Sequence, residues 1–484
     1  MIGAVLDWAH LSLVAAVLCV STLGQYVLLA FHALFPFPGA LEWLHRRSRP
    51  LQSLFRANLG MRTAGIEGRM SARELAEAEG LRLEDHHAVT PDGFVLVLHR
   101  LVNPGKLDGP NGNSRSPGDG KGKEARPAVL LMHGLMQDSE SLLCGGRDHA
   151  LGLRLAARGF DVFLGNARGN RYSHKHLRLS PLTSDAYWDF SIDELARCDT
   201  PAMIEKVLQV SGQSQLCYIG FSQGTAQAFA AFSGSSDLLN KISLFVALSP
   251  AVRANHLSKS LLLSLVQANL RFINLLFGRR RMLSVALTWQ RMMSREFFVA
   301  TIDAAVSYLF SWKASEVSDE RKMEVYPHIY SYSSVKCVLH WFQMMYSGRL
   351  SMFADGPATQ YVPVTYDVAR VSCPVAIVYG GRDLLVEVES LIEMLPNVVL
   401  TIREAEYEHL DTMWADSAKD RVFPRVSMGH SRVPRCPVAA GAKRGLPLTT
   451  ALRGAEYHVF LANSAEGCPL LLKCGMLLSL ANHR

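Results

Sequence analysis

A serine lies between two glycines in the stretch G-F-S-Q-G, where Gly220 and Gly224 flank Ser222. An apolar run precedes this stretch and a helix-like run follows it, so the pattern predicts a sharp turn between a strand and a helix. Small neighbours let such a strained turn approach other elements closely. The serine hydroxyl then lies near the positive end of the helix dipole, which favours developing negative charge. Ser222 is the candidate nucleophile, although five residues alone also fit a structural serine.

A nucleophilic serine needs backbone N–H groups that bind the oxyanion. After a turn of this kind, one N–H belongs to the residue following the nucleophile and the other to a loop after an earlier strand. Gln223 is the first candidate, and Leu135 in L-L-M-H-G-L-M-Q-D-S (residues 130–139) is the second. His133 directly follows the expected strand, so we expect it to shape this loop rather than to act as the base.

The acid and the base should follow the serine in the order acid, then histidine. Asp383 in V-Y-G-G-R-D-L-L-V ends an apolar run, and His409 in E-A-E-Y-E-H-L-D-T-M-W follows the next one. Asp411 and Glu408 are rival acids, but both are too near His409 in sequence to orient its ring easily. The residues therefore favour a triad of Ser222, Asp383 and His409.

Short apolar runs alternate with helical patterns after residue 127. These runs are residues 128–132, 160–165, 216–220, 243–249, 374–380 and 397–402. Alternating strands and helices predict an α/β fold with a mostly parallel sheet covered on both faces. Residues 89–101 predict a hairpin around a Pro-Asp-Gly turn. The Gly/Pro/Ser/Lys-rich residues 103–127 predict a flexible surface loop.

The alternation stops between residue 251 and about residue 365, where the chain is helical and rich in Leu, Met, Phe and Trp. This insertion between two late strands predicts a helical cap. Its Leu-rich stretch, residues 256–278, contains Lys259 and Arg271, which leave too few uncharged residues for a membrane span. An amphipathic cap helix is therefore favoured over a second transmembrane helix.

Residues 8–35 contain no Asp, Glu, Lys or Arg. As a helix they would reach about 42 Å, against roughly 30 Å for the hydrocarbon core of a bilayer. A cleaved signal peptide has a shorter apolar region with a basic residue before it, whereas only Asp7 precedes this one. The basic H-R-R-S-R (residues 45–49) follows instead. We expect residues 1–60 to form a membrane anchor and interfacial stretch, with the body in the cytosol.

Charge and cysteine content exclude several other classes. Of the net charge of +7, residues 427–484 carry +5, and no basic stripe with interleaved aromatics suggests nucleic acid. The nine cysteines form no C-x-x-C pair, so neither a disulfide framework nor a zinc site is indicated. Asn-x-Ser/Thr is absent from the sequence, which favours a reducing cytosol.

The chain resembles the acid lipase family of α/β-hydrolases over residues 88–426. The motifs that carry the resemblance are P-D-G-F-V-L-V-L-H-R, M-H-G-L-M, D-V-F-L-G-N-A-R-G-N-R-Y-S-H-K-H, Y-W-D-F-S-I-D-E-L-A-R-C-D-T-P-A-M-I, G-F-S-Q-G, S-S-V-K-C-V-L-H-W-F-Q, G-G-R-D-L-L and E-H-L-D-T-M-W-A. The resemblance implies an α/β-hydrolase domain over about residues 80–426. It also implies Ser222, Asp383 and His409 as the triad, with Leu135 and Gln223 as the oxyanion hole.

Two departures from the family pattern point away from its secreted digestive or lysosomal branch. Secreted members have His at the position of Phe221 and a cysteine pair in the cap, where this chain has only Cys337. With the expected anchor, the chain is most similar to membrane-anchored fungal steryl ester hydrolases. The resemblance implies hydrolysis of sterol esters at lipid droplets or the endoplasmic reticulum, with no metal or organic cofactor.

Two alternatives to this function stay open. A triacylglycerol lipase would use the same triad on acylglycerols, and a catalytically silent lipid-binding scaffold would keep the cap and the anchor. The Pro/Gly/Arg-rich residues 427–484 lack periodicity and fall outside the resemblance. They are either a species-specific tail or a segment added by an error in gene prediction, and the composition favours the second.

Overall fold

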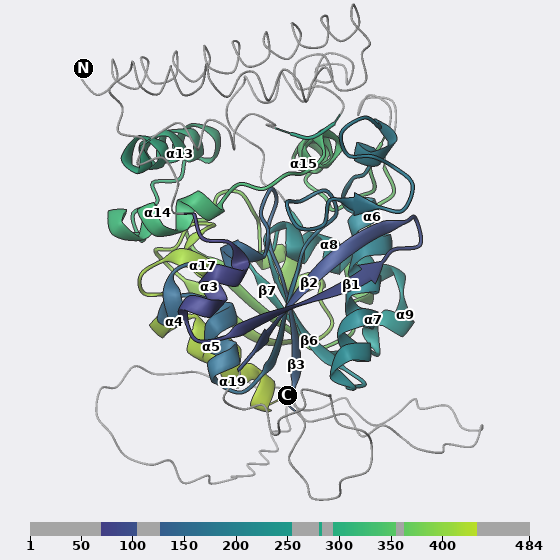
Figure 1. The fold of residues 1–484 in the computed structure, drawn as a ribbon, viewed down its shortest axis with the longest axis horizontal. Helices are drawn as coiled ribbons and strands as arrows, with labels where there is room; N and C mark the ends of the chain where they lie inside the picture. Colours follow the sequence, from purple (N-terminus) through teal and green to yellow (C-terminus); the bar gives the residue numbers. More distant parts are fainter. Residues whose placement is uncertain (1–68, 104–125, 254–279, 283–293, 355–362, 433–484) are drawn as a thin grey trace, which may run out of the picture. The chain divides into compact units, whose positions relative to one another are not determined.

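The computed structural model describes residues 69–103, 126–253, 280–282, 294–354 and 363–432. A nine-stranded sheet lies at the centre of this part of the chain (Figure 1). Its strands are β1 (Arg82–Val89), β2 (Phe94–Val102), β3 (Ala128–Met132), β4 (Asp161–Gly165), β5 (Lys175–His176), β6 (Leu216–Phe221), β7 (Ile242–Leu248), β8 (Val375–Gly380) and β9 (Val398–Glu404). The six strands predicted after residue 127 are all present, with ends that agree within two residues.

The strands run in the order β1-β2-β4-β3-β6-β7-β8-β9, and the short β5 pairs with β2. From β4 through β9 every neighbouring pair is parallel, whereas β2 is antiparallel to β1, β4 and β5. The prediction of a mostly parallel sheet is confirmed. Because parallel strands end at the same edge, the residues that follow β3, β6, β7, β8 and β9 are brought to one side of the molecule.

The predicted hairpin joins β1 and β2. The Thr90 N–H donates to the Phe94 carbonyl and the Gly93 N–H to the Thr90 carbonyl, both at 2.9 Å. Gly93 has φ of +98°, a conformation that L side chains rarely adopt. Strand β1 begins at Arg82, well before the apolar part of the hairpin, because this edge strand is largely polar. The sequence R-L-E-D-H-H offers no apolar alternation that would have marked its start.

Helices cover both faces of the sheet (Figure 1). On one face, Leu130 of β3 shares a core with Met203 and Phe229 of two covering helices. On the other, the next residue, Leu131, shares a core with α5 and α19. The first face is covered by α7 (Thr200–Ser211), α8 (Gln223–Gly234), α9 (Ser236–Leu239) and α16 (Glu389–Met394), and the second by α3 (Ala72–Ala78), α4 (Gly146–His149), α5 (Leu151–Ala157), α17 (Asp411–Trp414), α18 (Ala418–Arg421) and α19 (Phe423–Arg432).

Helix α3 begins eight residues before the expected start of the domain at residue 80. Ser71 caps it with a capping box completed by Glu74. Ala72 and Ala76 are fully buried against the second face of the sheet. The packed core therefore includes α3. At the other end, α19 continues past residue 426 to Arg432.

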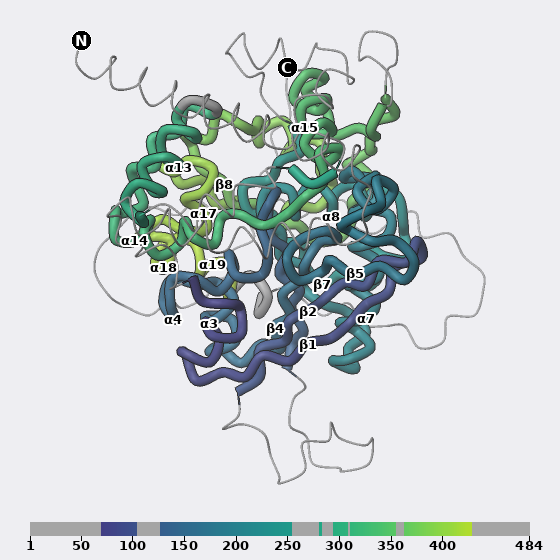
Figure 2. Tube along the Cα trace, turned by 45° about the horizontal axis from the view of Figure 1, so that its top comes forward, coloured from purple at the N-terminus to yellow at the C-terminus, as the bar shows by residue number. Residues whose placement is uncertain are grey.

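The described part of the cap lies between β7 and β8 in sequence. It contains α13 (Arg295–Phe310), α14 (Asp319–Val325) and α15 (Val335–Ser347). Both views place α13 and α15 at the same end of the sheet (Figures 1 and 2), and Figure 1 shows α7 and α19 toward the opposite end. Side chains from α13 and α15 pack into the two cores of the sheet, which ties the cap to the body.

Carboxylates of the body hold the backbone of the cap at three places. Asp193, in the short helix α6 (Ile192–Glu194), accepts the Phe353 N–H at 2.9 Å. Asp416 accepts the Ser318 N–H at 2.9 Å, and Glu408 accepts the Ala314 N–H at 2.8 Å. Charge-assisted hydrogen bonds of this kind are stronger than neutral ones.

Several expectations concern residues outside the described part of the chain. These are the anchor within residues 1–60, the surface loop at residues 104–125, the Leu-rich cap stretch 256–278 and the tail from residue 433. Among the residues that are described, no helix is long and apolar enough to span a bilayer.

Candidate active site

Ser222 occupies the turn between β6 and α8. Its backbone has φ of +51° and ψ of −114°, an unusual conformation for any residue other than glycine. The surrounding structure holds it there: the Ser222 N–H donates to the Leu248 carbonyl of β7 at 3.0 Å, and its carbonyl accepts from the Thr225 N–H and hydroxyl. Strain of this kind persists where neighbouring contacts over-determine the backbone, which is common at functional sites.

The two flanking glycines allow the turn to be this tight. A Cβ on Gly220 would lie 2.7 Å from the backbone of Gly224, and a Cβ on Gly224 would lie 2.6 Å from the Met132 carbonyl of β3. Neither contact is compatible with a larger side chain unless the backbone moves. The glycine spacing in G-F-S-Q-G therefore reflects the close passage of β3, β6 and α8.

The structure brings Ser222, His409 and Asp383 into one hydrogen-bonded chain. Nε2 of His409 lies 2.8 Å from Oγ of Ser222, and Nδ1 of the same ring lies 2.7 Å from Oδ2 of Asp383. The other carboxylate oxygen of Asp383 accepts the Leu385 N–H at 3.0 Å. His409 and Asp383 are both buried. An imidazole between a hydroxyl and a buried carboxylate can take the hydroxyl proton and return it later.

The rival acids make other contacts. Oδ2 of Asp411 accepts the backbone N–H of Glu408 at 2.6 Å. The Glu408 carboxylate accepts the backbone N–H groups of Lys313 and Ala314 at 2.8–2.9 Å. Burial, together with nearby carboxylates, raises the pKa of Asp411 to about 7. Asp383 is thus the carboxylate that contacts the His409 ring.

His133 lies in the loop after β3, and its ring makes hydrogen bonds outside the Ser222–His409–Asp383 chain. Its Nδ1 is 2.8 Å from the Gly134 carbonyl, so that nitrogen carries the proton. Its Nε2 accepts the Ala167 N–H at 3.2 Å and lies 3.3 Å from the Asn170 amide. Burial lowers the pKa of His133 to about 4, which keeps the ring neutral. These bonds join the loops after β3 and β4.

The two candidate oxyanion donors follow the neighbouring strands β6 and β3. Gln223 is the first residue of α8, so its backbone N–H has no partner within the helix. Leu135 follows β3 in a turn where the side chain of Gln137 accepts the Gly134 N–H at 2.9 Å. A Cβ on Gly134 would lie 3.1 Å from the Phe221 ring, so this turn contacts the residue before Ser222.

Two cap tryptophans at the site were not singled out from the sequence. Nε1 of Trp341, on α15, donates to the side-chain oxygen of Gln223 at 2.8 Å. The Trp312 ring stacks on His409 with centroids 5.2 Å apart and planes within 9°. Their distance in sequence from Gln223 and His409 left no local pattern that could pair them.

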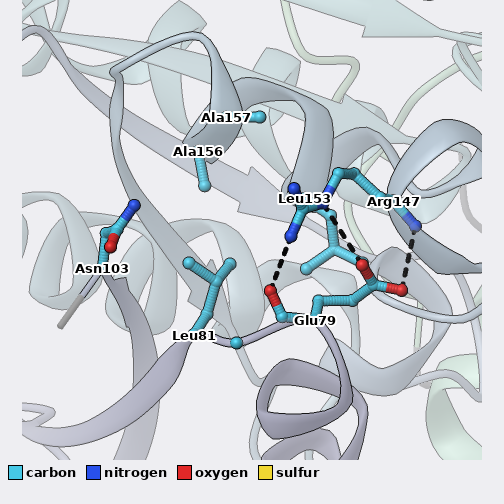
Figure 3. A pocket seen from close by; sticks show the side chains of 8 residues that line it. Glu79, Leu81, Asn103, Arg147, Leu153, Ala156 and Ala157 are labelled. Atoms are coloured by element: carbon cyan, nitrogen blue, oxygen red, sulfur yellow. Dashed lines mark hydrogen bonds and ion pairs between the residues drawn. The ribbon is translucent and has the colours of Figure 1, made fainter. Parts of the chain in front are cut away.

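A pocket of about 270 Å³ lies elsewhere, between α3, α4 and α5 (Figure 3). Its polar lining includes Glu79 and Arg147, which form an ion pair and are joined further by a hydrogen bond to the Glu79 carbonyl. None of the candidate catalytic residues lines it. The candidate triad lies instead at the edge where β6, β8 and β9 end.

Comparison with known proteins identifies the family of the chain. Residues 127–416 match the family described as alpha/beta hydrolase fold, and residues 72–146 match a partial alpha/beta-hydrolase lipase region. A probable lipase of Schizosaccharomyces pombe is 37% identical over 75% of this chain and 78% of its own. Human lipase member K is 32% identical, and rat gastric triacylglycerol lipase 31%, each over 74% of this chain and 90% of its own. The chain belongs to the acid lipase family of α/β-hydrolases and is a carboxylic ester hydrolase.

Proposed function

We propose that Ser222 is the nucleophile, His409 the general base and Asp383 the residue that orients the His409 ring. The observation that carries this proposal is the hydrogen-bonded chain of the three side chains at a strained strand-to-helix turn. Leu135 and Gln223 supply the N–H groups for the oxyanion.

The reaction has two stages. His409 takes the proton from Ser222 as Oγ attacks the ester carbonyl, and the tetrahedral oxyanion accepts hydrogen bonds from the Leu135 and Gln223 N–H groups. The C–O bond to the alcohol breaks as His409 donates the proton to the leaving oxygen. Water, deprotonated by His409, then attacks the acyl-enzyme, and the fatty acid leaves with Ser222 restored.

Replacing Ser222 with alanine tests this assignment. We expect Ser222→Ala to abolish ester hydrolysis and labelling by a fluorophosphonate, with little change in thermal unfolding, because only the covalent route is removed. The Asp237→Asn variant, at an exposed position on α9 and outside the proposed machinery, should still be labelled. Activity of Ser222→Ala within tenfold of wild type would move the nucleophile elsewhere, and an unlabelled wild type would favour the scaffold alternative.

For the substrate we propose a sterol ester, with a triacylglycerol as the second candidate. The resemblance to membrane-anchored sterol esterases and Phe221 before the nucleophile support the first. The similarity to rat gastric triacylglycerol lipase supports the second. Both substrates present the same ester to the same triad, so only the rates differ. Purified full-length protein should release fatty acid from emulsified cholesteryl oleate faster than from triolein, and the reverse order would select the second candidate.

For location we propose the surface of lipid droplets and the endoplasmic reticulum, with the catalytic body in the cytosol. Support comes from the uncharged residues 8–35, the basic residues 45–49 that follow them and the absence of glycosylation sequons. Deleting residues 1–38 should move a tagged protein to the soluble fraction. In intact microsomes a protease should digest the body of the full-length protein. A protected body would favour a lumenal location.

A further inference from the structure

Aromatic rings enclose the His409 imidazole from the cap and from the turn. Trp312 lies nearly parallel to the imidazole, with centroids 5.2 Å apart and planes within 9°. Phe310 stacks on Trp312 with centroids 4.6 Å apart. Phe221 contacts the imidazole at 5.6 Å with a tilt of 48°. Trp312 is buried, and in the described part of the chain its indole N–H makes no hydrogen bond. Its contact to His409 is made by the face of the ring.

The backbone that carries Trp312 is held in an uncommon conformation. Ser311 and Ala314 both have positive φ, at +61° and +49°. Each such residue costs free energy and persists only where its surroundings hold it. Ser311 is the C-cap of α13, and its N–H donates to the Ser307 carbonyl at 2.9 Å. Beyond Trp312, the buried carboxylate of Glu408 holds the backbone: it accepts the Lys313 N–H with both oxygens at 2.9 Å and the Ala314 N–H at 2.8 Å.

Glu408 therefore connects two features of the site. It directly precedes His409 in the chain, and its side chain fixes the turn whose tryptophan lies on the His409 ring. The backbone N–H of Glu408 is in turn fixed by Asp411 at 2.6 Å. A displacement of the turn at residues 311–314 would be transmitted to the imidazole through the indole face.

We propose that Trp312 is a positioning residue for His409, held in place by Glu408. The inference rests on the proposed function, because it assigns His409 the role of base. The bonds to Ser222 and Asp383 fix the two nitrogens, but tilting of the ring out of their plane is resisted only by what lies on its faces. The indole face fills that space, and it also attracts the imidazolium cation that forms during the reaction.

Trp312→Leu and Trp312→Phe form a matched pair, because both keep an apolar side chain and only phenylalanine keeps a ring face. With the soluble ester p-nitrophenyl butyrate, Trp312→Leu should lower kcat roughly three- to tenfold, in line with the loss of one aromatic contact. The KM should stay within about twofold of wild type, and Trp312→Phe should restore most of kcat. A role confined to folding stability would not separate the two variants at equal amounts of folded enzyme.

Glu408→Gln tests the same inference through a different residue and serves if Trp312→Leu does not fold. A glutamine oxygen can accept only part of the three hydrogen bonds, so the turn should loosen and kcat should fall by a similar factor. In the Trp312→Leu/Glu408→Gln double variant the losses in kcat should not multiply, because both changes remove the same positioning contact on His409. Multiplying losses would overturn the proposed link.

Two further outcomes would overturn the proposal. Equal kcat for Trp312→Leu and wild type would show that the ring contact has no part in catalysis. A change in KM alone that grows with acyl length would make Trp312 a wall of the substrate pocket instead. Ser222→Ala separates these failures from a failure of the proposed function: if it remains active, the triad assignment is wrong, whereas if it is inactive only the role of Trp312 is in question.

Discussion

Three acids surround His409, and their contacts decide which of them orients it. Asp383 comes from the loop after β8 and reaches Nδ1 of the ring, whereas Glu408 and Asp411 bind backbone N–H groups of their own neighbourhood. The loop after β8 can approach because Gly380 has no side chain: a Cβ there would lie 2.1 Å from the Tyr407 carbonyl. Asp383, the carboxylate most distant from His409 in sequence, is therefore the one that is hydrogen-bonded to its ring.

Asp383→Asn should be far more damaging than Asp411→Asn. An amide at this position can donate to Nδ1, which favours the wrong imidazole tautomer, and a loss of about ten-thousandfold in kcat is known for the same change in a serine protease triad. The measurement is kcat on p-nitrophenyl butyrate for both variants. A larger loss for Asp411→Asn would reassign the acid.

At the scale of elements, the site depends on how closely β3, β6 and α8 pass one another. Gly224 in the first turn of α8 lies against the Met132 and His133 carbonyls of the neighbouring strand end. Gly234 at the other end of the same helix has no atom near its missing Cβ. Both glycines lie in the same helix, but only Gly234 has room for a side chain.

Gly224→Ala should cost both stability and activity, because the added methyl forces α8 away from β3 and displaces the Gln223 N–H. We expect a loss of about 1–3 kcal/mol in the free energy of unfolding, as for other overpacked sites. Gly234→Ala is the matched control and should be neutral or slightly stabilising. Denaturant unfolding and kcat/KM would show the contrast, and similar effects of both substitutions would contradict it.

At the scale of the whole molecule, one buried carboxyl makes folding depend on pH. Burial, with the nearby carboxylates of Glu408, Glu316 and Asp383, raises the pKa of Asp411 from the ordinary 3.8 to about 7. Between these values the folded protein holds a proton that the unfolded chain releases. The contribution of Asp411 to the free energy of unfolding is therefore full below about pH 4 and is lost as the pH rises through 7.

Asp411→Asn should flatten this dependence. Its amide oxygen can still accept the Glu408 N–H, but the side chain no longer titrates. Between pH 5 and pH 8 the Tm of the wild type should fall further than the Tm of the variant. Asp237→Asn, at an exposed position on α9, is the control and should leave the wild-type slope unchanged. Parallel curves for wild type and Asp411→Asn would show that Asp411 does not titrate in this range.

Much of the scaffold could be predicted because its signals are local. Most of the parallel strands are short apolar runs, although β9 includes Thr401 and Arg403. Ser222, Asp383 and His409 each follow such a strand, so the parallel sheet predicted that they would lie at one edge. The start of β1 was missed because its edge position leaves it polar. The roles of Trp312 and Trp341 could not be predicted, because their contacts join residues far apart in sequence: Trp341 and Gln223 are 118 positions apart.

The carboxylates that hold the cap have a consequence for divergence within the family. Asp193, Asp416 and Glu408 bind backbone N–H groups at Phe353, Ser318 and Ala314, groups that nearly every amino acid possesses. Substitutions at Phe353 and Ser318 keep the N–H that is bound unless they introduce proline, whereas Ala314, at a φ of +49°, also disfavours β-branched residues. The attachment thus depends on acidic side chains of the body and on the backbone of the cap, so the side chains of the cap can vary without releasing it. A cap transplanted from a relative should dock on this body if its backbone follows the same path.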